Sequence, residues 1–292
     1  MKIFFQGTRL KKAKILTVAF SFAFFTASVQ AKSSQSESYN VAVYRGEAGC
    51  PGCSEMVVKS LIATGLPLHI SYVGEKEKLK LNAQTLKKFD LYIQPGGGQD
   101  IPGSYQALGD EGAEAIRNFV KSGKSFLGLC MGAYLADKDW IGLIDAPLES
   151  EVGRPGSQAV DEGDYTLQLT WNNKQEPFYY QDGPYLNSSI SSTGFQPIAY
   201  YKNGDIAIGK YRYGKGNIIL SGPHPEADET WIDSAAPGNT TAESKMQRIL
   251  SYLNKKKGLT DTLPCFTHSE IFFKYFKGKL RYFIKKNAAS VF

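Results

Sequence analysis

Apolar and polar positions follow two different patterns along the chain, and the change falls near its middle. In the first half, residues 39–44, 68–73 and 91–93 are short apolar runs that predict buried strands. Helical patterns cover 54–65 and 110–123, and we expect the second helix to be capped by Asp110. Strands that alternate with helices of this length favour a parallel sheet with helices on both faces.

The second half of the chain has the pattern of a β structure. Its short alternating or apolar runs predict strands over 165–171, 178–180, 197–201, 206–211 and 217–220. Asn203-Gly204 is a hairpin turn signal, and the Gly-, Pro- and acid-rich segment 146–163 is expected to form a surface loop. An amphipathic helix over 241–253 closes the pattern. We predict one α/β domain over 32–254, with a doubly wound, mostly parallel, flavodoxin-like sheet and β-hairpin additions in its second half.

The first 31 residues have the composition of an export signal. They hold five bases and no acid, and an apolar run over 15–29 leads to Val29-Gln30-Ala31. A basic start, an apolar stretch and a small-x-Ala site are typical of a secretory signal peptide. We therefore predict a signal peptide over 1–31 and a periplasmic or secreted protein, with an uncleaved membrane anchor as the alternative.

Charge is distributed unevenly over the rest of the chain. The formal net charge of +6 falls to +1 without the leader, and residues 255–292 carry nine Lys and Arg against Asp261 and Glu270, which leaves −6 for 32–254. An acidic body argues against nucleic acid as a partner. In the C-terminal tail, 255–292, aromatic and basic residues interleave. This tail is expected to make peripheral membrane contact or to pack on the domain with its lysines reaching water.

The segment Gly128-Leu-Cys-Met-Gly132 follows an apolar run and leads into a helical pattern. This is the form of a nucleophile elbow with sulfur in place of the serine oxygen. The two glycines suit a sharp turn from strand to helix, and a cysteine at a helix N-terminus is favoured as the thiolate. The alternative is a buried cysteine without chemistry at the end of a core strand.

A thiolate nucleophile needs a base and a group that orients the base. The chain holds His69, His224 and His268. His69 lies in an apolar strand and His268 in the tail, whereas His224 follows a predicted strand and has Glu226 two residues on. A carboxylate there can fix the imidazole tautomer. We therefore predict a Cys130-His224-Glu226 triad, with a structural loop role for His224 as the alternative.

Three motifs occur in an order that resembles the class I glutamine amidotransferase-like superfamily: Pro95-Gly-Gly-Gly98, Gly128-Leu-Cys-Met-Gly132 and His224-Pro-Glu226. Within it, segments 116–120, 130–134 and 179–185 look most like the biotin-protein ligase N-terminal domain. The resemblance covers about residues 39–254. It implies that Cys130 is the nucleophile, His224 the base and Glu226 its orienting group. It also implies an oxyanion site made by backbone N–H groups of Gly97 or Gly98 and of Met131.

One position departs from the pattern of that superfamily. Glutamine-using relatives carry Gln four residues after the nucleophile, where it helps to seat the substrate, and this chain has Tyr134. Glutaminase activity is therefore not expected, and biotin transfer is not implied because the ligase catalytic domain has no room after residue 254. We predict a cysteine-nucleophile amide or ester hydrolase, or an amidotransferase-like enzyme, for a small-molecule or peptide amide, without cofactor or metal. The alternative is a non-catalytic binding or scaffold protein of the cell envelope.

Cys50 and Cys53 form a C-x-x-C pair between the first strand and the first helix. In an exported protein a local structural disulfide is the favoured interpretation. A redox pair that regulates Cys130, a metal clip and two free thiols are the alternatives. A thiol-disulfide oxidoreductase is a third functional class, although the surrounding sequence is not thioredoxin-like.

Overall fold

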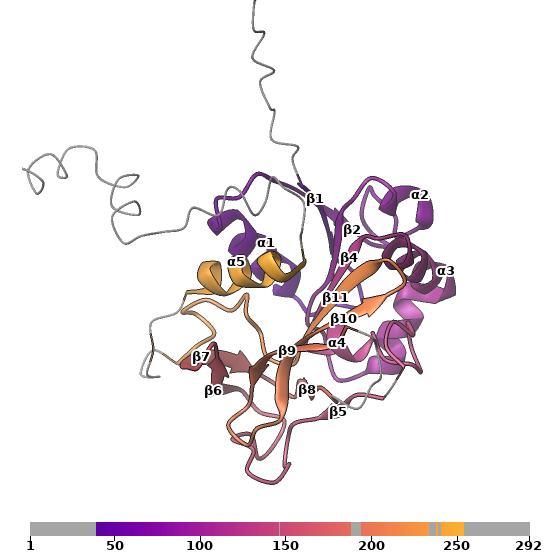
Figure 1. The fold of residues 1–292 in the computed structure, drawn as a ribbon. Helices are drawn as coiled ribbons and strands as arrows, with labels where there is room; N and C mark the ends of the chain where they lie inside the picture. Colours follow the sequence, from indigo (N-terminus) through magenta and orange to yellow (C-terminus); the bar gives the residue numbers. More distant parts are fainter. Residues whose placement is uncertain (1–38, 146, 188–193, 234–237, 239–240, 254–292) are drawn as a thin grey trace, which may run out of the picture. The chain divides into compact units, whose positions relative to one another are not determined.

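A computed structural model describes residues 39–145, 147–187, 194–233, 238 and 241–253 (Figure 1). The predicted signal peptide and the C-terminal tail lie outside these residues. The described chain forms a nine-stranded sheet in the order β2-β1-β3-β4-β11-β10-β9-β6-β7. Its strands are β1 (Tyr39–Tyr44), β2 (Leu68–Val73), β3 (Leu91–Gln94), β4 (Ser125–Leu129), β6 (Tyr165–Trp171), β7 (Lys174–Tyr180), β9 (Gln196–Tyr200), β10 (Ile206–Tyr213) and β11 (Gly216–Ser221). A separate two-stranded sheet pairs β5 (Glu149–Ser150) with β8 (Pro184–Tyr185).

The sheet has a parallel part and an antiparallel part. Strands β2, β1, β3, β4 and β11 pair in parallel, and with β11 as the fifth strand their order is that of a flavodoxin-like doubly wound sheet. Beyond β11, the strands β10, β9, β6 and β7 pair antiparallel and extend the sheet by hairpins. The predicted fold class is thus confirmed.

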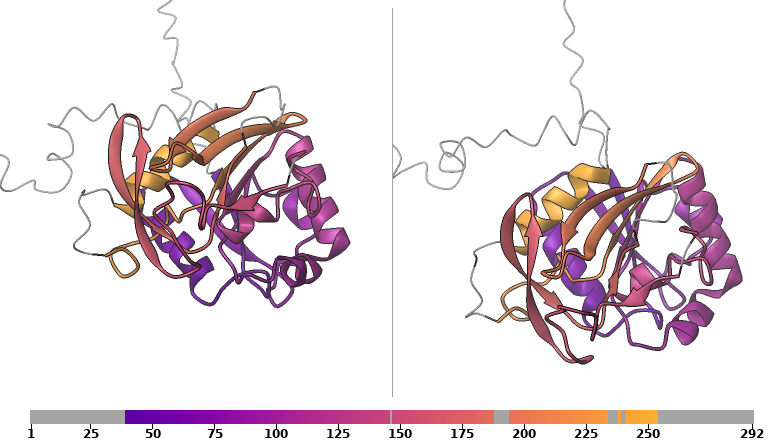
Figure 2. Two further views of the ribbon diagram at one scale, coloured as in Figure 1. Left: turned by 90° about the horizontal axis from the view of Figure 1, so that it is seen from below. Right: turned by 60° about the horizontal axis from the view of Figure 1, so that its bottom comes forward.

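Helices cover both faces of the parallel part, as Figures 1 and 2 show. The helices are α1 (Cys53–Ala63), α2 (Ala83–Leu86), α3 (Ile101–Lys121), α4 (Met131–Tyr134) and α5 (Ala242–Leu253). Neighbouring strand residues point to opposite faces, so in β4 Phe126 joins the core cluster that contains α3, and Leu127 joins the cluster of α1 and α5. These two apolar clusters hold the carboxyl ends of the parallel strands in place. None of the described helices is long and apolar enough to cross a membrane.

The helix predicted over 110–123 is the second part of α3, which joins two helical segments at a kink. Helix α3 begins at Ile101, where the side chain of Asp100 accepts a hydrogen bond from the N–H of Gly103, and it kinks at Gly109 (φ 68°) before Asp110. Asp110 therefore follows a kink instead of capping the helix. The kink hides the first turns because Gly109 breaks the helical pattern in the sequence.

The helix after the elbow is short. Helix α4 spans only four residues, and the chain turns at Asp137, whose side chain accepts hydrogen bonds from the N–H groups of Asp139 and Leu148. An aspartate that bonds the nearby backbone in this way competes with helix continuation. The helix dipole behind Cys130 is correspondingly small.

In the second half, all five predicted strands are present, and the hairpin turn at Asn203-Gly204 connects β9 to β10. No pattern in the sequence predicted the short elements α2, β5 and β8. The segment 146–163 is only partly a surface loop, because Glu151 and Ala159 in it are fully buried.

Candidate active site

The candidate site lies at the carboxyl ends of three neighbouring parallel strands. β3 leads into the glycine loop Gly96–Gly98, β4 ends at Cys130, and β11 is followed by His224. In a doubly wound sheet, ligands bind in the crevice outside these strand ends. Segments far apart in the sequence are therefore brought to one edge by the topology.

Cys130 has the backbone of a strained elbow. Its φ of 52° and ψ of −114° are uncommon for a residue with a side chain, and its N–H donates to the carbonyl of Ser221 at 2.8 Å. A Cβ atom on Gly128 would clash with the carbonyl oxygen of Gly132, and one on Gly132 would clash with that of Gln94. The turn can therefore form only with glycine at both positions.

Cys130, His224 and Glu226 come together at this edge. His224 is 4% exposed and Glu226 is fully buried, and Nδ1 of His224 lies 2.8 Å from Oε1 of Glu226. The charge of the Cys130 side chain and a hydrogen bond to it act on the pKa of the imidazole, which places the two groups next to each other. Since Nδ1 faces Glu226, we assign the bond to Cys130 to Nε2. The Sγ of Cys130 additionally donates to the carbonyl of Gln181 at 3.2 Å.

The electrostatic environment of His224 favours the imidazolium form. Burial alone would lower the pKa of His224, but the charges of Glu226 and Cys130, together with hydrogen bonds to both, outweigh it and raise the pKa to about 10. An imidazolium next to a cysteine favours the thiolate form that cysteine nucleophiles use. The arrangement can therefore supply both a nucleophile and a proton donor.

The ring of His224 is fixed from several sides. Its backbone N–H donates to the carbonyl of Tyr179 at 2.9 Å, and the rings of Tyr179 and Trp231 lie at 5.3 and 5.7 Å from it in edge-on contact. A Cβ on Gly96 would lie 2.6 Å from Cε1 of His224. The glycine loop thus approaches the imidazole more closely than any other residue type would allow.

The predicted oxyanion donors line a cavity of about 460 Å³ next to Cys130. Gly97, Gly98 and Met131 all border it. In the part of the chain that the structure describes, the N–H groups of Gly97 and Gly98 donate to no residue, and Met131 is the first residue of α4, whose N–H has no partner within the helix. These donors are available to a bound oxygen atom.

Tyr134 forms part of the cavity wall. It is 8% exposed, and its hydroxyl donates to the carbonyl of Asp182 at 3.2 Å. Burial raises its pKa, so it stays a neutral phenol at physiological pH. The cavity is further lined by Ser150, Gln181 and Asp182, which sequence reasoning missed. Ser150 donates to Oδ1 of Asp182 at 2.5 Å, and only the left-handed backbone of Asp182 (φ 48°) marks that residue as unusual.

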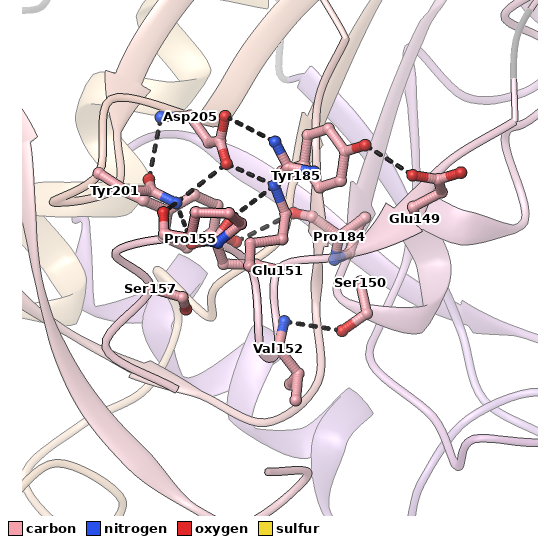
Figure 3. Close-up of polar contacts among 12 residues, drawn as sticks. Glu149, Ser150, Glu151, Val152, Pro155, Ser157, Pro184, Tyr185, Tyr201 and Asp205 are labelled. Carbon is pink, nitrogen blue, oxygen red and sulfur yellow. Dashed lines mark hydrogen bonds and ion pairs between the residues drawn. The ribbon is translucent and has the colours of Figure 1, made fainter. Parts of the chain in front are cut away.

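The segment behind Ser150 is built around a buried carboxyl group (Figure 3). Glu151 is fully buried and accepts a hydrogen bond from the side chain of Asn203 at 2.8 Å. Arg154 makes two hydrogen bonds to Asp205, at 2.5 and 3.2 Å. Burial, with the charge of Asp205, raises the pKa of Glu151 to about 7. Glu151 and Arg154 lie in a segment that composition marks only as a loop, whereas Asn203 and Asp205 lie at the hairpin turn.

Cys50 and Cys53 are joined in a disulfide at the start of α1. The N–H of Cys50 donates to the carbonyl of Gly96 at 3.0 Å, so the disulfide turn adjoins the glycine loop. His69 is exposed on the edge strand β2, apart from this constellation. His268 and Cys265 lie outside the described residues. No group of side chains among 39–145, 147–187, 194–233, 238 and 241–253 has the make-up of a metal site.

Comparisons with known proteins agree with the resemblance drawn from the motifs. The family model "Biotin-protein ligase, N terminal" matches residues 39–141. The biotin–protein ligase of Schizosaccharomyces pombe is 24% identical over 268 residues, which cover 77% of this chain and 39% of the ligase. The chain thus spans well under half of that ligase. The imidazole glycerol phosphate synthase subunit HisH of Caldanaerobacter subterraneus subsp. tengcongensis is 27% identical over 176 residues, or 54% of this chain and 81% of that subunit.

Solved structures agree on the fold. The PurLQS structure from Thermotoga maritima has a TM-score of 0.52 at 18% identity and covers 74% of this chain and all of the matched one. A crystal structure of a glutamine amidotransferase has a TM-score of 0.51 at 15% identity, with 73% and 97% covered. The chain therefore has a glutamine amidotransferase-like fold and carries a region similar to the biotin-protein ligase N-terminal domain.

Proposed function

We propose that this chain, which resembles the biotin-protein ligase N-terminal domain on a glutamine amidotransferase-like fold, is an exported cysteine-nucleophile hydrolase or amidotransferase-like enzyme that acts on amides or esters. The observation that carries the proposal is the meeting of Cys130, His224 and Glu226 beside a cavity lined by Gly97, Gly98 and Met131. Glu226 holds the imidazole by Nδ1, and the other ring nitrogen serves the thiol. This is the division of roles that a catalytic triad requires.

The proposed reaction has two halves. The Cys130 thiolate attacks the substrate carbonyl carbon, and the resulting oxyanion is held by backbone N–H groups of the glycine loop and of Met131. His224 then gives its proton to the leaving amine or alcohol as the C–N or C–O bond breaks, which leaves a thioester on Cys130. In the second half, His224 removes a proton from water, or from another acceptor nucleophile, which attacks the thioester and frees the thiol.

The residues that line the cavity limit which substrates we propose. Tyr134 stands where glutamine-using relatives carry Gln, and its hydroxyl already donates to the carbonyl of Asp182. Glutamine is therefore not the substrate that we propose, and we do not extend biotin transfer to this chain. The 460 Å³ cavity suits a small amide or the end of a peptide.

The reactivity of Cys130 tests the proposal. We expect iodoacetamide to alkylate Cys130 at least about tenfold faster than a free cysteine at pH 7, because the thiolate is the reactive form. His224→Ala should remove that advantage. Peptide mass mapping identifies the alkylated cysteine, and Cys130→Ala is the blank. A native Cys130 as slow as free cysteine would disprove the triad.

A non-catalytic binding protein on the same fold is the second candidate. The hydrogen bond from Cys130 Sγ to the Gln181 carbonyl favours it, because that bond is made by a thiol and occupies the nucleophile. In this case a small molecule or peptide would bind the cavity without turnover. A burst of 4-nitrophenol from 4-nitrophenyl acetate, equal to the enzyme concentration and absent in Cys130→Ala, separates the enzyme from the binding protein.

Export and membrane contact remain proposals on the sequence evidence. The leader over 1–31 and the C-terminal tail supply them. Cell fractionation of the full chain, followed by N-terminal sequencing, tests export, and a cytoplasmic protein that keeps residues 1–31 contradicts it. Vesicle sedimentation with and without 259–292 tests the tail, and equal partitioning rules out membrane contact through it.

A further inference from the structure

The cavity next to Cys130 is lined by one acidic residue, Asp182, which lies in the turn between β7 and β8. Among the described residues that line it there is no Lys, Arg or His, and Tyr134 is a neutral phenol. His224, next to Cys130, is favoured as the imidazolium and can balance a thiolate there. Asp182 therefore gives the cavity wall a negative charge that none of the lining residues balances.

The carboxylate of Asp182 is held in a fixed place. Its Oδ1 accepts a hydrogen bond from Oγ of Ser150 at 2.5 Å, and its backbone carbonyl accepts one from the Tyr134 hydroxyl at 3.2 Å. Both donors come from residues that also line the cavity. The left-handed backbone of Asp182 (φ 48°) is uncommon for a residue with a side chain and persists only where the surrounding contacts enforce it. The carboxylate is thus preorganised at the cavity wall.

Among the described residues, the second oxygen of this carboxylate has a weak partner. Oδ2 lies 3.4 Å from Nε2 of Gln99, and the same amide makes a shorter bond of 2.8 Å to Oε2 of Glu162. One neutral amide group therefore lies between two carboxylates. Neither carboxylate forms an ion pair with another described residue. The negative charge at this end of the cavity is left for a bound cation to balance.

Asp182 also lies close to the proposed nucleophile. The Sγ of Cys130 is 3.2 Å from the carbonyl oxygen of Gln181, and this carbonyl belongs to the peptide bond that leads into Asp182. Consecutive Cα atoms are about 3.8 Å apart. A substrate whose carbonyl carbon is bound at Cys130 can therefore reach Asp182 with a group a few bonds away. In a cavity, opposite charges at such range attract more strongly than in bulk water.

We propose that Asp182 is a specificity-determining residue of this site, and that it selects substrates with an ammonium or guanidinium group a few bonds from the scissile carbonyl. The proposal rests on the proposed function and names the substrate class of the same cavity. A charge-assisted hydrogen bond from the substrate cation to Oδ2 of Asp182 orients the carbonyl at Cys130. Tyr134 contributes by holding the backbone of Asp182 in place.

A purely structural role for Asp182 makes a different prediction. If the side chain only closes the turn by its bond to Ser150, an amide oxygen serves as well as a carboxylate oxygen. Asp182→Asn keeps that acceptor, suits the left-handed backbone and removes the charge. The variant should therefore fold like the wild type, and a loss of selectivity for cations in it reports the charge itself.

Charged thiol reagents measure this selectivity without turnover. On the full-length protein, Cys130 is modified with 2-(trimethylammonium)ethyl methanethiosulfonate or with 2-sulfonatoethyl methanethiosulfonate, and peptide mass mapping confines the rates to Cys130. The ratio of the two rates is divided by the same ratio for 2-mercaptoethanol. We expect this normalised preference for the cation to be about tenfold or more in wild type and to fall by at least about fivefold in Asp182→Asn.

The matched control is Asp161→Asn, which removes an exposed acid beside Glu162 that does not line the cavity. This variant should stay within about twofold of the wild-type ratio because its charge is screened by water. A ratio that is the same in wild type and Asp182→Asn, or that falls equally in the control, would overturn the role of Asp182.

A pair of substrates of the same shape tests the same point in turnover. β-Alanyl 4-nitroanilide and butanoyl 4-nitroanilide differ in an ammonium in place of a terminal methyl group. We expect kcat/KM of the wild type to be about tenfold or more higher for the β-alanyl compound, and Asp182→Asn to remove this preference mainly through KM. An equal preference in both proteins contradicts the proposal. If the wild type cleaves neither anilide and Cys130 is alkylated no faster than free cysteine, the proposed function fails, while the reagent ratio still decides whether Asp182 selects cations.

Discussion

Glu226 and Glu151 are both fully buried, and each has one carboxylate oxygen without a hydrogen bond in the described structure. Their surroundings differ. Glu226 faces the imidazole of His224 and feels the charge of Lys245. Glu151 accepts from the neutral amide of Asn203, and its nearest cation, Arg154, is at 3.9 Å and bound to Asp205.

The difference shows that burial does not by itself decide whether an interior carboxyl group is charged. The negative charge of Glu226 acts on the neighbouring imidazole, and the pKa of His224 rises to about 10. Near Glu151, Arg154 is bound to Asp205, whose negative charge also acts on Glu151. Burial together with this charge raises the pKa of Glu151 to about 7. Glu226 raises the pKa of an imidazole, whereas Glu151 is a neutral group below about pH 7.

The largest expected effect belongs to Glu226→Gln. A raised histidine pKa stabilises the fold fully below pH 6.5, and this stabilisation is lost as pH rises through about 10. The shift corresponds to at most about 5 kcal/mol. In Glu226→Gln most of this pH dependence should vanish, since the largest favourable charge is gone. Urea unfolding at pH 6, 8 and 10 measures it.

Glu151→Gln is the matched control for that measurement, because it changes an equally buried glutamate. It should leave the histidine-dependent slope between pH 7 and 8 intact and leave Cys130 alkylation within twofold of wild type. Equal slopes in wild type and Glu226→Gln would mean that Glu226 does not hold the imidazolium.

Glu151→Gln should itself raise the free energy of unfolding at pH 8. The folded state keeps a proton on Glu151 that the unfolded chain loses from pH 4.5 upward, so the free energy of unfolding falls as pH rises from 4.5 to about 7. Glutamine escapes this loss and keeps the acceptor for Asn203. We expect the variant to be more stable than wild type at pH 8, by up to about 3 kcal/mol, and no more stable at pH 4. A variant that is less stable at pH 8 would show that Glu151 is held as an anion.

Lys245→Met should change how the free energy of unfolding depends on pH above pH 8. The folded protein releases the lysine proton near pH 8 and the unfolded chain keeps it to about 10.5, so Lys245 raises the free energy of unfolding over that window, by up to about 3 kcal/mol. In wild type this rise offsets the fall caused by His224. Between pH 8 and 10 the wild-type curve should therefore be nearly flat, while the Lys245→Met curve keeps falling. Parallel curves in urea unfolding would contradict the lowered pKa.

The motifs of the candidate site could be recognised in the sequence because they are local and have steric reasons. Gly128 and Gly132 are required by clashes that any side chain would cause, and such positions are visible in one sequence as a Gly-x-Cys-x-Gly pattern. The order of strands followed from the same logic, because alternating strands and helices bring their carboxyl ends to one edge.

What the sequence could not predict are contacts made across long distances by ordinary residues. Lys245 looks like one more polar position of an amphipathic helix, and its burial depends on how α5 packs against β7. Ser150 and Asp182 meet from separate loops. Glu151 is buried in a segment whose composition is that of a loop. In each case the environment is created by tertiary packing, which no local pattern records.

The smallest expected effect concerns Ser150, which joins the region of Glu151 to the cavity. Its hydroxyl donates to Asp182 and accepts from the N–H of Val152 at 2.9 Å. Ser150→Ala removes both bonds and should cost about 1 kcal/mol in urea unfolding. Because the imidazole and the elbow are held by other contacts, Cys130 alkylation should change less than threefold. Ser157→Ala, in the same segment but off the cavity, controls for loss of a loop hydroxyl. A tenfold change in alkylation for Ser150→Ala alone would show that the two buried glutamates belong to one coupled site.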